Sequence, residues 1–271
     1  MADSSSSLGQ RQDPKFDSSV PQTARIWNYW LGGKDHFPVD QAVGDQILEA
    51  FPAIVENARA ARAFLARAVR YLTGEAGIRQ FLDIGTGLPT ANNTHQVAQA
   101  VAPECRVVYV DNDPMVLVHA RALLTSTPEG VTDYIDADLR HPDRILREAA
   151  RTLDFTQPIA IMLMGILGHI ADDDEAQSIV KRLMDAVPSG SYLTMNDGTD
   201  TSQEVVEAAR IWNQSANPTY HLRSPDRIAR FFDGLELVEP GIVSPPQWRP
   251  EPSPSGPPAG IDSFCGIGRK P

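Results

Sequence analysis

The chain has 271 residues, enough for one large domain or two small ones with a sizeable core, and its 42% hydrophobic and 22% charged residues are typical of a globular protein. A formal net charge of −11 disfavours nucleic acid and anionic membranes as partners. Because Cys105 and Cys265 lie far apart and no apolar stretch suits a signal peptide or a membrane span, we expect no disulfide framework, no metal site and a cytoplasmic location.

The N-terminal quarter of the chain predicts a tail and a helical extension. Residues 1–20 are polar and serine-rich, which indicates disorder. We assign residues 21–76 to an N-terminal helical extension or lid. Within it, QTARIWNYWL predicts a short helix that ends at the pair Gly32-Gly33, and apolar residues spaced by three and four predict a longer helix over 54–72.

The remainder, 77–271, alternates strand and helix patterns. Apolar β-rich runs predict strands at 79–85, 106–111, 131–136, 159–164 and 191–197, followed by two late strands at 235–243 and 261–268. Helices are expected at about 93–101, 114–125, 142–152, from 172 onward, 202–214 and 224–232. This alternation predicts a parallel sheet covered on both faces. The proline-rich segment 244–260 is predicted to be irregular, and extended or mobile.

A glycine turn follows the first of these strands, in the stretch FLDIGTGLPT. Gly85 and Gly87 match the first two glycines of a dinucleotide-binding loop, but Thr90, preceded by Pro89, stands at the third position. Asp83 lies two residues before the first glycine, where its carboxylate would repel a pyrophosphate. It would instead suit a cationic ligand, and S-adenosylmethionine (SAM) carries both an ammonium and a sulfonium.

Acidic residues also end the next two strands. Asp111 is placed to accept hydrogen bonds from ribose hydroxyls, as in both NAD and SAM sites. Asp138 can accept from an adenine amino group while Leu139 packs beside the ring. Each aspartate alone could cap the following helix or turn instead. Three of them at the carboxyl ends of successive strands, where open α/β sheets bind ligands, predict a SAM pocket.

Several stretches together resemble a known family, among them ARIWNYWLGGKDHFPVD, QFLDIGTGLPT, VVYVDNDPMVLVHARALL and PSGSYLTMND. Over about residues 21–271 the chain resembles class I SAM-dependent methyltransferases, and more closely the actinobacterial S-adenosyl methyltransferase family, formerly a domain of unknown function. The resemblance implies an α/β, Rossmann-like class I methyltransferase fold. Its sheet would have seven strands, mostly parallel with an antiparallel last strand, between helices on both faces.

The resemblance also implies SAM as the cofactor and a set of residues around it. It places Asp83, Gly85 and Gly87 at the methionine end and sulfonium, Asp111 and Asn112 at the ribose, Asp138 and Leu139 at the adenine, and Met164 and Gly165 at the wall that closes the pocket. Because Pro89 replaces the usual third glycine, the path of the loop stays open.

The N-terminal segment allows two interpretations. Its aromatic residues either pack a helix onto the core or form a lid over the cofactor, with Tyr29, Lys34 and His36 facing the active site. Arg59 and Arg62 either bind the carboxylate of the cofactor or lie along apolar surface.

The sequence predicts a methyltransferase with an unidentified, small-molecule acceptor. His169, His36, Asp197 and the pair Tyr220-His221 are candidate general bases, and transfer by proximity without a base is the alternative. Two other functions stay open: a non-catalytic SAM-binding regulator and an NAD-dependent oxidoreductase. The acceptor pocket is expected to form from the N-terminal segment and residues 165–170 and 196–224, and nothing indicates an oligomeric state.

Overall fold

The computed structural model describes residues 17–123, 125–252, 256 and 258–271. The strands are β1 (Gln80–Ile84), β2 (Arg106–Asp111), β3 (Val131–Asp136), β4 (Ala160–Met164), β5 (Tyr192–Gly198), β6 (Glu236–Leu237) and β7 (Ser263–Arg269). The helices are α1 (Thr23–Trp30), α2 (Pro38–Ala50), α3 (Ile54–Gly74), α4 (Thr94–Val101), α5 (Pro114–Leu123), α6 (Pro142–Ala149), α7 (Asp173–Asp185), α8 (Gln203–Ser215) and α9 (Pro225–Arg230).

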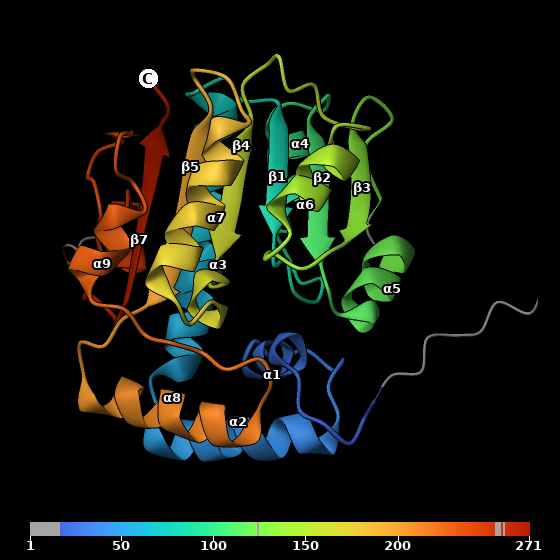
Figure 1. Ribbon diagram of the computed structural model, residues 1–271. Helices are drawn as coiled ribbons and strands as arrows, with labels where there is room; N and C mark the ends of the chain where they lie inside the picture. Colours follow the sequence, from blue (N-terminus) through green and yellow to red (C-terminus); the bar gives the residue numbers. More distant parts are fainter. Residues whose placement is uncertain (1–16, 124, 253–255, 257) are drawn as a thin grey trace, which may run out of the picture.

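The strands form one seven-stranded sheet in the order β3-β2-β1-β4-β5-β7-β6 (Figure 1). β1 to β5 are parallel to one another, whereas β7 pairs antiparallel with both β5 and β6. The predicted fold class is confirmed. The predicted strand 235–243 is much shorter than expected, because only Glu236–Leu237 and an isolated bridge from Val243 to Cys265 pair with β7.

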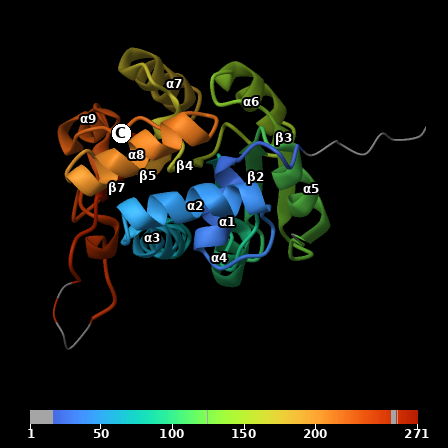
Figure 2. The ribbon, with the colours of Figure 1, turned by 90° about the horizontal axis from the view of Figure 1, so that it is seen from below.

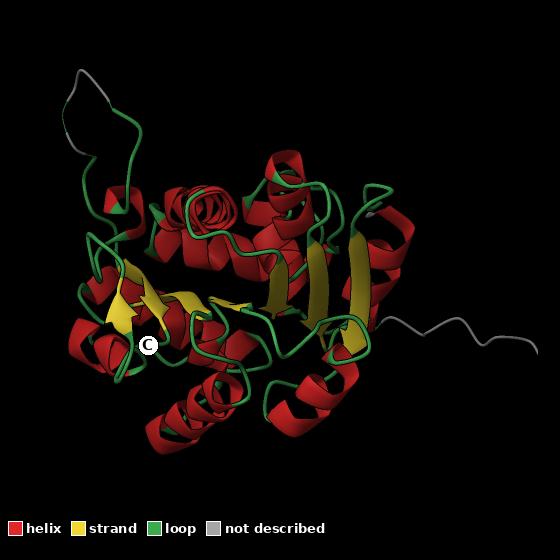
Figure 3. Cartoon of the chain, turned by 90° about the horizontal axis from the view of Figure 1, so that it is seen from above, coloured by secondary structure: helices red, strands yellow, loops and turns green. Residues whose placement is uncertain are grey.

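Helices cover both faces of the sheet (Figure 3). One core cluster joins α6, α7 and α9 to one face, and a second joins α3 and α4 to the other. All five residues of β1 are buried, as expected for a central parallel strand between two helical layers. Residues 54–74, which the sequence assigns to the N-terminal extension, therefore form part of the layer that covers the sheet.

Side-chain caps start several of these helices. The carboxylate of Asp172 accepts from the backbone N–H of Glu175, and the hydroxyls of Ser202 and Ser224 accept in the same way at the start of α8 and α9. The helix expected at 142–152 ends at residue 149, and residue 124, in the helix expected at 114–125, lies outside the described residues.

Helix α2 is absent from the sequence prediction. Its signals are Pro38 at the first helical position and Asp40 in the first turn, but Gly44 interrupts the pattern, and glycine weakens a helix. The tertiary packing requires this glycine. A Cβ atom at Gly44 would lie 2.7 Å from the ring of Tyr29, so the glycine lets α1 and α2 approach closely.

Part of the proline-rich segment is ordered, in contrast to the prediction for 244–260. Residues 245–247 form a short 3₁₀ turn, and Trp248 is fully buried against α3. The guanidinium of Arg67 donates to the carbonyl oxygens of Trp248 (2.9 Å) and Pro245 (2.6 Å). Packing and these hydrogen bonds supply the order that proline-rich composition alone does not indicate. Residues 253–255 and 257 lie outside the described residues.

Helices α1, α2 and α8 lie across the carboxyl ends of the parallel strands, below the sheet in Figure 1 and facing the viewer in Figure 2. They share a third apolar cluster, which includes Trp30 of α1, Ile47 of α2 and Trp212 of α8. Residues 1–16 of the predicted tail lie outside the described residues, while the carbonyls of Asp17 and Val20 accept hydrogen bonds from Arg25. Among the described helices, none combines the length and apolar character that crossing a bilayer demands.

Candidate active site

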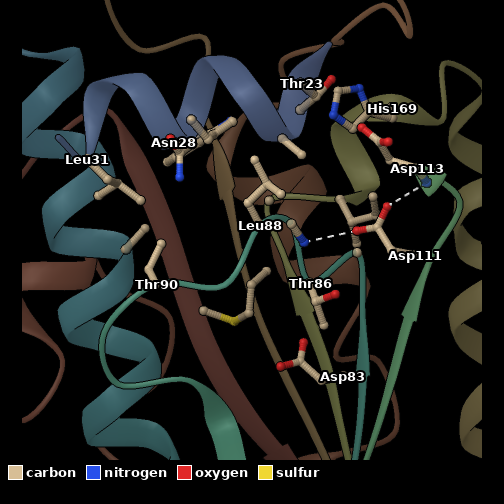
Figure 4. A pocket seen from close by; sticks show the side chains of 18 of the residues that line it. Thr23, Asn28, Leu31, Asp83, Thr86, Leu88, Thr90, Asp111, Asp113 and His169 are labelled. Carbon is tan, nitrogen blue, oxygen red and sulfur yellow. Dashed lines mark hydrogen bonds between the residues drawn. The ribbon is translucent and has the colours of Figure 1, made fainter. Parts of the chain in front are cut away.

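A cavity lies between the carboxyl ends of the central strands and α1, with α1 as its roof (Figure 4). Loops after β1, β2, β4 and β5 supply its floor and walls. Its lining includes the predicted cofactor residues Asp83, Gly85, Gly87, Asp111, Asn112, Met164 and Gly165. Residues from seven separate segments therefore converge on the edge of the sheet where parallel α/β proteins bind ligands.

The glycine turn leaves backbone open to a ligand. Gly85, Gly87 and Gly165 have φ angles of +77°, +65° and +73°, a conformation that favours glycine. A Cβ atom at Gly87 or Gly165 would meet no atom within 4 Å. The loop after Gly87 takes a compact path in which Asn93 caps α4 and bonds to Thr90, so it does not need the third glycine.

Asp83 lies at the floor of this cavity and is 4% exposed. Its carboxylate accepts a hydrogen bond of 2.5 Å from the hydroxyl of Thr94. Burial raises the pKa of Asp83 to about 6, while the Thr94 hydroxyl and the positive charge of Arg62 act in the opposite direction. Asp83 is thus a buried acidic group that a cationic ligand would keep ionised.

Asp111 connects the glycine turn to the end of β2. One carboxylate oxygen accepts from the backbone N–H of Gly87 (2.9 Å) and the other from that of Asp113 (3.0 Å), as the dashed lines in Figure 4 mark. Burial raises the pKa of Asp111 to about 6 as well. These bonds orient the carboxylate at the cavity wall, with acceptor capacity left for hydroxyl groups of a ligand.

A smaller cavity continues from this site along the ends of β2 and β3. It shares Gly85, Asp111 and Asn112 with the first cavity, and Asp138 and Leu139 lie in its wall. The carboxylate of Asp138 accepts from the backbone N–H of Arg140 (2.8 Å) and from the side-chain amide of Asn112 (3.3 Å). All the sequence-predicted cofactor residues therefore line one of these two connected spaces.

The roof helix faces the cavity with different residues from those predicted. Thr23, Ala24, Trp27, Asn28 and Leu31, which recur at helical spacing, line it. No signal in the sequence distinguished this face of α1, because aromatic residues surround the helix.

The predicted lid residues lie elsewhere. The hydroxyl of Tyr29 donates to Asp45 (2.5 Å) on α2, and the ring of His36 packs edge-on against Tyr29. Lys34 is exposed and lines neither cavity. Of the two arginines, Arg62 lines the first cavity and donates to the carbonyls of residues 91 and 92, whereas Arg59 points to the exposed side of α3.

A third, mostly apolar cavity adjoins the first; we call it the aromatic cavity. Its walls come from α1, α2, α3, β5 and α8 and the segment around residue 220, and include Trp27, Trp30, Phe51, Asn57, Trp212 and Tyr220. Trp27, Ala61, Gly165 and Asn196 line both this cavity and the first. Asn57 and Asn196 lie within the segments expected to form the acceptor pocket, but the sequence did not single them out, since an isolated asparagine carries no motif.

The candidate general bases do not meet in the aromatic cavity. His169 lines the first cavity, and its Nδ1 lies 2.8 Å from the carbonyl oxygen of Thr219, so Nδ1 carries the proton; burial lowers its pKa. Asp197 lines neither cavity. It accepts from the hydroxyl of Tyr220 and from the backbone N–H groups of Gly168 (2.9 Å) and Gly198 (3.1 Å), and burial raises its pKa to about 6.

His36 and His221 also lie outside both cavities. Asp197 thus holds Tyr220 in the cavity wall and has no open path to a reacting atom. Among the described candidates, His169 lines the first cavity and Tyr220 lines the aromatic cavity.

Comparisons with known proteins agree with this arrangement. The model of the S-adenosyl methyltransferase family matches residues 9–271. A crystal structure of a DUF574 family protein from Streptomyces avermitilis is 46% identical, with a TM-score of 0.90 over 94% of this chain and 99% of that one. A candidate methyltransferase from Thermobifida fusca is 44% identical, with a TM-score of 0.86 over 93% of this chain and 95% of that one.

More distant structures share the fold. Magnesium protoporphyrin IX methyltransferase from Synechocystis is 12% identical, with a TM-score of 0.54 over 91% of this chain and 93% of that one. A search of curated proteins gave no match. The family model spans nearly the whole chain and the similar structures share its fold, so this protein belongs to the S-adenosyl methyltransferase family.

Proposed function

We propose that this SAM-dependent methyltransferase acts on a small-molecule acceptor bound in the aromatic cavity. The observation that carries the proposal is the junction between the two cavities. Trp27, Ala61, Gly165 and Asn196 line both, so a molecule in the aromatic cavity lies next to the methionine side of the cofactor site. The NAD-dependent alternative has no support in the family match, which covers nearly the whole chain.

The residues around the first cavity fit SAM. Asp83, Gly85 and Gly87 would hold its methionine end, with Arg62 available to its carboxylate, Asp111 and Asn112 its ribose, and Asp138 and Leu139 its adenine. The open backbone at Gly87 and Gly165, where a Cβ atom would meet nothing within 4 Å, leaves room for a closely packed ligand. Bound SAM would supply a methyl group already activated by the sulfonium.

The protein's own contribution is alignment and exclusion of water. Helix α1 covers the junction, and the apolar walls of the aromatic cavity desolvate the acceptor. The acceptor's lone pair would form the new bond to the methyl carbon as the carbon–sulfur bond breaks. The electron pair of that bond would stay on sulfur, so that the donor would leave as S-adenosylhomocysteine (SAH), and the acceptor's proton would leave to solvent.

Turnover tests this proposal. We expect the purified protein to bind SAM in calorimetry and to form SAH with members of a panel of neutral aromatic alcohols and amines. Gly165→Leu should place a side chain at the junction and reduce turnover at saturating SAM. SAM binding without SAH formation across the panel would instead favour a non-catalytic regulator, and binding of NADH alone would contradict the assignment.

SAM affinity should fall as the pH falls below about 6. Burial raises the pKa of Asp83 and of Asp111 to about 6 each in the protein without ligand. Below that pH both carboxyls become neutral and lose their attraction for a cation, so SAM, which favours the ionised forms, must displace protons. Because each group can contribute up to about tenfold per pH unit, we expect SAM affinity to fall roughly tenfold or more between pH 7 and pH 5. Calorimetry across this range measures it, and a flat profile would contradict the assignment.

Asp138→Ala should weaken SAM binding by about tenfold, the equivalent of one hydrogen bond to a charged group. The carboxylate lies in the smaller cavity beside Leu139, where an adenine amino group would reach it. Asp136→Ala is the matched control, since Asp136 ends β3 on the exposed side. Equal SAM affinities for the two variants would show that Asp138 does not belong to the cofactor site.

A further inference from the structure

The aromatic cavity presents ring faces with few free polar atoms. The indole N–H of Trp30 donates to the carbonyl of Gly44 (3.3 Å), and that of Trp212 donates to the carbonyl of Pro218 (2.9 Å). The hydroxyl of Tyr220 donates to Asp197 and accepts from the backbone N–H of Gly198 (3.0 Å). Because the protein already satisfies these polar groups, the three rings offer mainly apolar surface to a ligand.

Two carboxamides in the same cavity, unlike these rings, have a polar atom that the described residues do not satisfy. Asn57 on α3 is 9% exposed and Asn196 on β5 is 5% exposed. The side-chain oxygen of each is buried without a hydrogen-bond partner among the described residues. A buried polar group without a partner has lost its hydrogen bonds to water without compensation, so each of these side chains is suited to a ligand that supplies the missing hydrogen bond.

Both carboxamides lie near the junction of the aromatic cavity and the first cavity, where the methyl group would be transferred. Asn196 lines both cavities, and Asn57 lies one helical turn before Ala61, which also lines both. Other polar side chains of the wall are engaged: the hydroxyl of Ser263 donates to the carbonyl of Asp197 (2.8 Å), and the carboxylate of Asp262 accepts from Thr201 (2.7 Å). The polar contacts left for an acceptor are therefore concentrated beside the sulfonium end of the cofactor site.

The charge of the cavity limits the acceptor further. Asp262 is the one ionisable acid in the described lining, and no lysine, arginine or histidine belongs to that lining. A carboxylated or phosphorylated acceptor would enter without a basic side chain in this lining to balance it. The aromatic walls, conversely, suit a flat ring system.

We infer that the acceptor is a neutral, planar aromatic molecule whose hydroxyl donates to the side-chain oxygen of Asn57 or Asn196, or whose amino group donates to both. This rests on the proposed function of the aromatic cavity and adds the chemical class of its ligand. The carboxamides bind the group next to the methyl donor, and neither can act as a base. The aromatic cavity would thus select acceptors that donate a hydrogen bond and carry no charge.

Calorimetry on the full chain saturated with SAH, with naphthalene probes, tests the inference. We expect 2-naphthol to bind and 2-naphthoate to bind at least tenfold more weakly at pH 7.5. The double variant Asn57→Leu/Asn196→Leu, which keeps the side-chain size, should weaken 2-naphthol about tenfold, the value of one hydrogen bond of about 1.4 kcal/mol. The single variants identify which carboxamide meets the hydroxyl.

Gln46→Leu is the matched control, because it removes an exposed carboxamide from α2, the helix that also supplies Ile47 to the cavity. Equal binding of 2-naphthoate and 2-naphthol by the wild-type chain would overturn the inference, and this comparison needs no variant. Unchanged 2-naphthol affinity in a folded double variant would also overturn it. If SAH binds but no probe does, the inference fails alone; if SAH does not bind, the proposed function fails.

Discussion

Replacing Asp83 with asparagine is expected to weaken SAM binding by about 100-fold, or about 2.7 kcal/mol, because a buried positive charge loses its partner. The wild-type carboxylate faces Arg62 and, in the proposed complex, the cationic end of SAM. Asparagine keeps the shape and can still accept from Thr94, so the fold should persist. With Asp83 neutral, however, the positive charge of Arg62 and the cationic groups of the ligand repel each other without compensation.

A comparison of SAM with SAH isolates the charge effect, because SAH lacks the sulfonium. We expect Asp83→Asn to weaken SAH less than SAM, which would reduce the preference for the methyl donor over the product. Thr94→Val is the control: it removes the 2.5 Å hydrogen bond but leaves the charge. Calorimetry with both ligands measures each difference. Equal losses for SAM and SAH would place Asp83 away from the sulfonium.

Asp40→Ala is expected to destabilise the protein by about 3–5 kcal/mol, the cost of leaving one member of a buried ion pair without its partner. Arg25 on α1 and Asp40 on α2 lie 2.9 Å apart with side chains 2% and 0% exposed. The carboxylate of Asp40 also accepts from the backbone N–H groups of Gln22 (2.9 Å) and Phe37 (2.8 Å). Its removal would thus release α1, the roof of the cofactor cavity.

Two measurements follow from that geometry. Urea unfolding should report the lost stability, and calorimetry should report weaker SAM binding because Trp27 and Asn28 lose their support. Glu207→Ala breaks an exposed pair with Arg210, with side chains 47% and 54% exposed, and should change stability by less than about 0.5 kcal/mol. Wild-type stability and SAM affinity for Asp40→Ala would show that the pair does not hold the roof.

The cofactor site was largely predictable because its signals are local. The strand that ends at Ile84, the glycine turn after it and the acids Asp111 and Asp138 each lie within a few residues of a strand end. Parallel strands bring their carboxyl ends to one edge of the sheet, so adjacent signals in the sequence become neighbours in space. The helices other than α2 were likewise predicted in their chain order from signals within each segment.

Other elements depended on contacts that periodicity does not encode. Gly44 obscured α2, although the helix needs a glycine against Tyr29. Trp248 is buried within a proline-rich segment because Arg67, far away in the chain, binds its carbonyl oxygen. The N-terminal aromatics were ambiguous, and the cavity-facing residues proved to be Trp27 and Asn28 on another face of α1.

By itself, the sequence determined the fold class, the cofactor and the strand ends that surround it, since each is written in a short stretch of residues. Only the tertiary structure revealed the aromatic cavity, where we propose that an acceptor binds. The aromatic cavity is the space left between α1, α2, α3, β5 and α8, and Asn57 and Asn196 both line it from segments far apart in the chain. A helical period shows which face of a helix is apolar, whereas the packing of distant helices determines what that face encloses.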